Sequence, residues 1–406
     1  MKKWLIPTLA LSVAALALGQ AQQVTLEQWY HQYGEAGTQQ AVQRYAADYT
    51  KKTPNVKVNV SWIPGNYTQK LNAALLSGTG PDLFEDASDI YTRAKAGQIV
   101  PLDDLFTAQD KKDFGPILGT VTYKGKIYAV PMIMDTVVLY YRKSALAKAG
   151  VKPPTTYAEL LAASKKLTTG GQKGLFIGND GGVAALATWM PASAGVPLVQ
   201  GNKVTFDNSR TVKAYEALRA LNQSGVLLKG APQDFWDPTA FNQGLTAMQI
   251  NGLWALPAVE KALGDDFGVL PWPKLDAQGK SVMLYGSWNI AVNAKSKNVA
   301  AAKALVKAQW IQNTALQAEW ATAYGFHLPP RASATQAAAK LSKGNAAEVV
   351  RLNKTYGQLL PTGWGGGMQT ALNDVAAQAV NGNQPLAPLV KAAAAKAQAE
   401  LTQRLK

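Results

Sequence analysis

Residues 56–62 read VKVNVSW, in which Val56, Val58 and Val60 alternate with polar residues. Successive side chains of a β-strand point to opposite faces, so this alternation predicts a strand with one buried face. Residues 24–30 upstream predict another strand, and the helical spacing of residues 42, 45, 46 and 49 predicts a helix between the two. Downstream, residues 67–75 predict a helix and residues 82–85 a third strand. This alternation of strands and helices predicts a wound, parallel α/β sheet.

A similar pattern recurs later in the chain. Thr156 and Glu159 form a capping-box pattern at the start of a helix. Residues 175–178 and 246–251 are strand-like, and a helix with Pro257 in its first turn follows. Because 406 residues suffice for two hydrophobic cores, we expect two wound α/β lobes with crevices that face each other.

The N-terminus has the pattern of an export signal. Lys2 and Lys3 precede an apolar run at residues 4–18, and the small-residue site predicts cleavage after Ala21. The run is shorter than the roughly 20 residues of a membrane-spanning helix. The sequence has no cysteine, which excludes thiol chemistry and a lipidated N-terminal Cys. An exported protein without an anchor needs an enclosed compartment, so we expect a periplasmic protein.

The charge distribution does not favour nucleic-acid binding. The net charge is +15, but the basic residues are scattered singly and in pairs along the chain. No basic block and no basic-aromatic motif is present, so a solvated basic surface explains the charge better. We expect no nucleic-acid partner.

Candidate ligand-binding residues follow the predicted strands. In open parallel sheets ligands bind outside the carboxyl ends of the strands. The first strand leads into Trp29, Tyr30, His31 and Glu35, and Trp62 ends the second. Asp86 and Asp89 follow the third strand, within the stretch GTGPDLFEDASD at residues 78–89. His31 could bond a ligand or lie at the surface, and both readings stay open.

Catalytic motifs are absent from the sequence. It contains no HExxH, GxSxG, Walker or GxGxxG motif, and its two histidines are His31 and His327. His327, between Phe326 and Leu328, is expected to be structural. We therefore expect no enzyme activity, cofactor or metal. Carboxylate pairs hydrolyse glycosides, but carboxylates also accept hydrogen bonds from sugar hydroxyls while indoles cover sugar C–H faces. Six tryptophans in predicted loops or strand ends suit that role: Trp29, Trp62, Trp236, Trp254, Trp288 and Trp364.

Several motifs, in order, resemble the family 1 extracellular solute-binding proteins of ABC importers, which include maltose- and trehalose-binding proteins. They are LEQWYHQYGE, LLSGTGPDLFE, GKIYAVPMIMDTVVLYYRKSALAKAGVKPPTTYAELLAA, AMQINGLWA, GSWNIAVNAKSKNVAAAKALV and GFHLPPRA. The resemblance implies two α/β lobes, of the type II periplasmic-binding-protein kind, joined by hinge strands around a sugar. It also implies ligand contacts at Trp29, His31, Asp86, Asp89, Asp135, Trp254, Trp288 and Trp364. Maltose binders carry an arginine where this chain has Ile90.

The expected function is that of a monomeric substrate-binding component of an ABC transporter. It would capture a neutral mono- or oligosaccharide and deliver it to a membrane permease. The alternatives are a binder of a polyamine or another cationic solute, and a secreted glycoside hydrolase. We expect a signal peptide at residues 1–21, an N-terminal lobe from residues 24–133 and 286–330, and a C-terminal lobe from residues 137–284 and 331–406.

Overall fold

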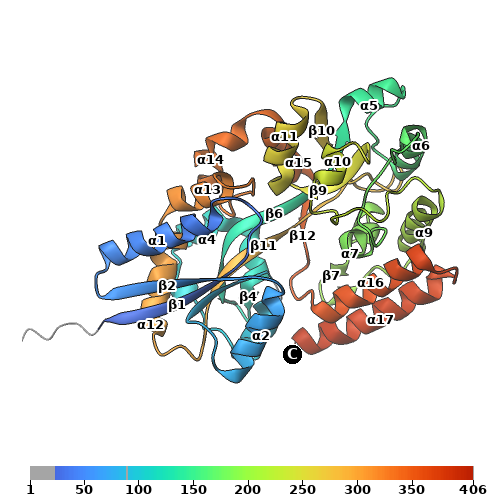
Figure 1. Ribbon diagram of the computed structural model, residues 1–406. Coiled ribbons are helices and arrows are strands. Elements are labelled where there is room, and N and C mark those ends of the chain that lie inside the picture. Colours follow the sequence, from blue (N-terminus) through green and yellow to red (C-terminus); the bar gives the residue numbers. More distant parts are fainter. Residues whose placement is uncertain (1–22, 88–89, 406) are drawn as a thin grey trace, which may run out of the picture.

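The computed structural model describes residues 23–87 and 90–405. The signal peptide predicted for residues 1–21 and the candidate Asp89 lie outside the described residues. The chain forms two α/β lobes joined by long strands (Figure 1). In the part of the chain that is described, no helix is both long and apolar enough to cross a membrane.

The first lobe is built on the three strands predicted near the N-terminus. These are β1 (Val24–His31), β2 (Val56–Ile63) and β3 (Leu83–Asp86), and both β2 and β3 pair with β1 in parallel. Helices α1 (Thr38–Lys52) and α2 (Tyr67–Ser77) connect them. The predicted strands, helices and parallel pairing are confirmed. The carboxyl ends of β1 and β3 therefore meet at one edge of the sheet.

Two long strands run from the first lobe into the second. In β6 (Ala129–Arg142), the first half pairs with β11 (Met283–Val292) and the second half with β9 (Met248–Gly252) and β10 (Phe267–Leu270). The other end of β11 pairs with β3. A third connection passes beside β6, where Leu328 forms a bridge with Met134. We call β6 and β11 the hinge strands, because they contribute to the sheet pairing of both lobes.

Separate hydrophobic cores lie on either side of the hinge strands. The first lobe packs α1, α2 and the helices near residues 299–322 against its sheet, and there Trp310 and Trp320 are buried, as predicted. The second lobe has one core beneath α6, α9, α16 and α17 and another beneath α11 and α15. The main helices of this packing are α6 (Tyr157–Leu167), α9 (Ser209–Gln223), α11 (Leu256–Leu263), α12 (Val299–Val306), α13 (Thr314–Thr322), α15 (Gly344–Tyr356), α16 (Gly366–Asn381) and α17 (Leu386–Leu405).

Shorter elements complete the two lobes. The predicted capping box is present, since Thr156 and Glu159 exchange hydrogen bonds at the start of α6. The strand predicted at residues 175–178 is wrong: Leu175 and Phe176 form only isolated bridges, and Gly178, at φ 108°, ends the extended run. The remaining elements are α3 (Ile90–Lys95), α4 (Ala108–Phe114), β4 (Thr122–Tyr123), β5 (Lys126–Ile127), α5 (Lys143–Lys148), α7 (Val183–Leu186), α8 (Trp189–Ser193), β7 (Val199–Gln200), β8 (Lys203–Val204), α10 (Thr239–Asn242), α14 (Ala332–Ala337) and β12 (Gly357–Leu359).

Candidate functional site

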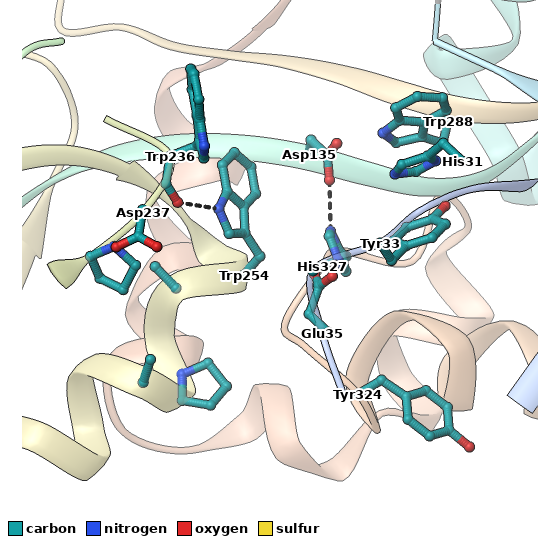
Figure 2. Close-up of a pocket in the computed structure, with 15 residues that line it drawn as sticks. His31, Tyr33, Glu35, Asp135, Trp236, Asp237, Trp254, Trp288, Tyr324 and His327 are labelled. Carbon is teal, nitrogen blue, oxygen red and sulfur yellow. Dashed lines mark hydrogen bonds and ion pairs between the residues drawn. The ribbon is translucent and has the colours of Figure 1, made fainter. Parts of the chain in front are cut away.

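A cavity of about 470 Å³ lies between the lobes, beside the hinge strands (Figure 2). We call it the central cleft. The first lobe contributes the loop after β1, and the second lobe contributes the loop before α10 and the first turn of α11. The aromatic and ionisable side chains that line it are His31, Tyr33, Glu35, Asp135, Trp236, Asp237, Trp254, Trp288, Tyr324 and His327.

One wall of the central cleft is a stack of aromatic rings anchored on a buried carboxylate. The His31 ring lies 3.8 Å from the rings of both Trp288 and Tyr33, measured between centroids. Glu85, which is fully buried, contacts the Nδ1 of His31 and accepts a 2.9 Å hydrogen bond from the Tyr33 hydroxyl. Burial raises the pKa of Glu85 above its ordinary value, against the effect of His31. These contacts fix the orientation of the stacked rings.

The floor of the central cleft is a chain of three ionisable side chains. His327 places Nδ1 at 2.6 Å from Asp135 Oδ1 and Nε2 at 3.0 Å from Glu35 Oε1 (Figure 2). Burial alone would lower the pKa of His327, but the charges and hydrogen bonds of Asp135 and Glu35 raise it to about 9. Burial would likewise raise the pKa of Glu35, but the hydrogen bond from His327 lowers it. An imidazolium between two carboxylates therefore ties together three segments of the chain.

The opposite wall is formed by two indoles. Trp254 donates a 3.0 Å hydrogen bond from Nε1 to the main-chain carbonyl of Trp236, which fixes the ring (Figure 2). Trp236 is 53% exposed, so its indole is accessible at the cleft. Gly252, at the end of β9, lies beneath the Trp254 ring: a Cβ there would lie 2.0 Å from ring atoms. The motif NGLW thus combines a tryptophan with the glycine that makes room for it.

We predict that Gly252→Ala displaces the Trp254 ring and weakens ligand binding by about tenfold or more, since a stacked aromatic is worth on the order of 1–3 kcal/mol. Gly171→Ala is the matched control, because a Cβ at that exposed position meets no atom within 4 Å. Titration calorimetry on both variants measures the effect. Equal affinities for the two variants would contradict the role given to Gly252.

A second cavity, of about 430 Å³, lies between Tyr91 of α3, the β11 strand and the glycine-rich segment before α16. We call it the Trp364 pocket. Ser287 and Asn289 of β11 line it, whereas Trp288 lines the central cleft. Since side chains alternate along a strand, the two cavities lie on opposite faces of β11.

The structure brings together about half of the residues predicted from the sequence. The central cleft contains His31, Asp135, Trp236, Trp254 and Trp288. Trp364 lines the Trp364 pocket instead, with its ring 9% exposed and packed against the core of the second lobe.

Four other predicted residues have different surroundings. Asp86, the last residue of β3, is 1% exposed. Its side chain points into the lobe, where it accepts a hydrogen bond from Arg93. Tyr30 is 2% exposed and belongs to the first-lobe core. Trp29 and Trp62 pack against that core and line neither cavity. The expectation that these four side chains face the ligand therefore does not agree with their placement.

The cleft also contains residues that the sequence did not single out as ligand-binding. His327 was expected to be structural, but it lines the cleft and bridges two carboxylates. Glu35 was predicted to lie past the end of the first strand but was not assigned to the ligand site, and Tyr33 lies between His31 and Glu35 in the same loop. Asp237 and Tyr324 had no local signal.

The chemical character of the cleft suits the recognition of hydroxyl groups. Its described lining contains three carboxylates, two imidazoles, two phenols and three indoles, and no lysine or arginine. Carboxylates accept hydroxyl hydrogen bonds, and indoles cover C–H faces. Among the described residues, no group of three or more His, Asp or Glu side chains is arranged to hold a metal ion.

Known proteins similar to this chain are solute-binding proteins. The family described as bacterial extracellular solute-binding protein matches residues 44–348. The maltotriose-binding protein of Pyrococcus abyssi is 28% identical over 257 residues, which cover 59% of this chain and 52%, about half, of that relative. A probable ABC transporter-binding protein of Deinococcus radiodurans is 29% identical over 345 residues, or 79% of this chain and 80% of that protein.

A similar fold is found among solved structures. The GacH receptor of Streptomyces glaucescens, solved in the unliganded form and in complex with acarbose, superposes with a TM-score of 0.78 and 25% identity. The match covers 94% of this chain and 99% of the receptor. The two-lobed α/β architecture predicted from the sequence is that of these binding proteins.

Proposed function

The chain belongs to the family of bacterial extracellular solute-binding proteins, and we propose that it captures a neutral mono- or oligosaccharide between its lobes for an ABC transporter. The observation that carries this proposal is the central cleft, where the Trp254 and Trp288 indoles flank the carboxylate of Asp135. That combination suits a polyhydroxylated ring with apolar faces. The names of the relatives agree with it, since one is a maltotriose-binding protein and another an ABC transporter-binding protein.

We assign roles to the cleft residues as part of this proposal. Trp254 and Trp236 would stack on the sugar from one lobe and Trp288 with His31 from the other. Asp135, Glu35 and Asp237 would accept hydroxyl hydrogen bonds. Trp364 would contact a ligand in its own pocket, and Asp89 stays a predicted hydroxyl acceptor.

The lobe boundaries and partners belong to the proposal as well. An N-terminal lobe from residues 24–133 and 286–330 and a C-terminal lobe from residues 137–284 and 331–406 are supported by the hinge strands, which leave one core and enter the next near these boundaries. We further propose cleavage after Ala21, a periplasmic location, a monomer, delivery to a membrane permease and no role in nucleic-acid binding.

We propose that the protein performs no chemistry on its ligand. A glycoside hydrolase needs a carboxylic acid that stays protonated near neutral pH. In the central cleft the hydrogen bond from His327 lowers the pKa of Glu35, which favours the opposite protonation state. Ligand recovered unaltered after prolonged incubation is the expected result, and released monosaccharide would contradict it.

A cationic solute is the second candidate. Three carboxylates face the cleft, and its described lining holds no lysine or arginine, in a chain whose net charge is +15. Carboxylates and aromatic faces both attract ammonium groups. The test of the proposed function must therefore include polyamines beside sugars.

We predict that a thermal-shift panel identifies the ligand class. Maltotriose, mannotriose, trehalose, glucose, putrescine and spermidine would be tested on the wild type and on Trp254→Ala. A ligand at 100 times its dissociation constant adds about 2.7 kcal/mol to stability. We expect stabilisation by at least one saccharide, reduced in Trp254→Ala. Stabilisation by polyamines alone would favour the second candidate, and a wild type that no saccharide stabilises would contradict the proposed sugar.

A further inference from the structure

The end of α17 touches the first lobe at helix α3. Lys95 of α3 donates from Nζ to the main-chain carbonyl of Gln403 at 2.9 Å. Arg404 donates from Nη1 to the hydroxyl of Thr92 at 3.1 Å, and its guanidinium lies 4.2 Å from the centroid of the Tyr91 ring. The C-terminal end of α17 accordingly points towards the lobe that contains β1 and β2 (Figure 1).

The two sides of this contact belong to different cores. Helix α3 is anchored in the first-lobe core by Ile90 and Ala94. Helix α17 is anchored in the second-lobe core by Ala397 and Leu401. The contact therefore joins the two lobes, and any rotation that separates α3 from α17 must break it.

Arg404 is built into this position by the second lobe. Its side chain is only 7% exposed and pairs with Glu400 at 3.4 Å, one turn earlier on α17. Glycines make room for the pair: a Cβ on Gly365 would lie 2.0 Å from Glu400 Oε1, and one on Gly367 would lie 2.3 Å from Glu400 Oε2. The approach of Glu400 and Arg404 thus explains the glycines at positions 365 and 367.

The same contact borders a cavity between the lobes. Tyr91, whose ring faces Arg404, lines the Trp364 pocket together with the glycine run. On its other side Tyr91 packs edge-on against Tyr123 of β4, with ring centroids 4.7 Å apart. Tyr91 therefore cannot follow α17 if the lobes move apart, because its own lobe holds it.

We infer that Tyr91, Thr92 and Lys95 of the first lobe and Gln403 and Arg404 of the second form an interlobe clasp that holds the Trp364 pocket closed. The clasp closes one side of the Trp364 pocket and has to release before a ligand enters or leaves there. This inference extends the proposed capture of a ligand between the lobes, but the geometry of the clasp is independent of which ligand is captured.

The lobe separation tests the clasp without any ligand. The chain has no cysteine, so spin labels on Lys52→Cys and Lys165→Cys, two exposed positions on opposite lobes, report one interlobe distance by pulsed electron resonance. We expect a narrow distribution for the parent and a longer, broader one for Arg404→Ala. Arg351→Ala is the matched control, since Arg351 pairs with Glu348 on its own helix and is 63% exposed.

A second variant covers the case in which Arg404→Ala fails to fold. Thr92→Ala combined with Lys95→Ala changes two exposed residues of α3 and should open the lobes in the same way. An unchanged distance distribution in the folded variants would overturn the clasp. Failure of every sugar to bind would overturn the proposed function while the distance measurement still decides the clasp.

Discussion

Asp86→Ala should lower the free energy of unfolding by about 3–5 kcal/mol, because it removes a buried carboxylate that binds the buried Arg93 guanidinium. The Asp86 and Arg93 side chains are 2% and 6% exposed and form an ion pair. Arg93 also donates to Asn72 at 2.9 Å and to Gln98 at 3.2 Å, and its guanidinium lies over the Phe84 ring. Such a network is costly to break from one side, since the remaining charge cannot regain water.

Urea unfolding of purified Asp86→Ala measures this loss. The matched control is Glu348→Ala, which breaks an exposed pair with Arg351 and should cost less than about 1 kcal/mol. The result separates two roles for Asp86, because the sequence placed it among the ligand contacts. A variant as stable as the wild type that no longer binds ligand would return Asp86 to the binding site.

Local patterns were sufficient for the first lobe. The alternation at Val56, Val58 and Val60 gave the strand β2, because a sheet with one buried face requires that period. Parallel pairing followed from the helices between the strands, since parallel strands need a crossover connection. These features depend on residues that are neighbours in sequence, so they could be predicted without a structure.

The side-chain directions at the strand ends could not be predicted in the same way. Asp86 and Asp89 are three positions apart in one acidic stretch, and both looked suited to a ligand. The structure points Asp86 inward to Arg93, a residue seven positions later. Whether the last residue of a strand faces the cleft or the core depends on the position of the next helix, which no alternation pattern records.

His327 shows most clearly what the local sequence could not predict. Its neighbours Phe326 and Leu328 are apolar, so the local sequence indicates a packing role. Its partners Asp135 and Glu35 lie 192 and 292 positions away, on segments that meet only at the hinge. The resemblance to binding proteins indicated Asp135 as a ligand contact, and its motif GFHLPPRA includes His327 without assigning it a role.

The clasp and the His327 bridge should respond differently to a rotation of the lobes. The clasp joins α3 of one lobe to α17 of the other, so a rotation of the lobes separates its two sides directly. The bridge lies beside β6, where the same rotation changes distances little. We therefore expect the bridge to persist when the lobes open. Loss of the bridge should change the free energy of unfolding and leave the distance between the lobes unchanged.

Between pH 6.5 and 9 the wild type should lose up to about 3 kcal/mol of unfolding free energy through His327. The pKa of His327 is raised to about 9 in the folded protein, whereas an unfolded histidine titrates near 6.5. A group whose folded pKa is raised stabilises the protein fully below the unfolded pKa, and this stabilisation disappears as the pH rises through the folded pKa. Glu35 behaves in the opposite sense. Because its pKa is lowered in the folded protein, its contribution to the free energy of unfolding is lost as the pH falls through that pKa.

The measurement is urea unfolding across this pH range for the wild type, His327→Gln and His31→Gln. The sequence has only two histidines, so the difference between the two variants isolates the His327 imidazole. His327→Gln should be less stable near pH 6.5 and show a flatter profile, because Asp135 and Glu35 then face each other without a cation between them. His31→Gln should keep the fall of stability above pH 6.5. Parallel profiles for all three proteins would mean that the imidazole between the two carboxylates is neutral throughout, and the bridge would then stabilise the hinge only as a neutral hydrogen bond.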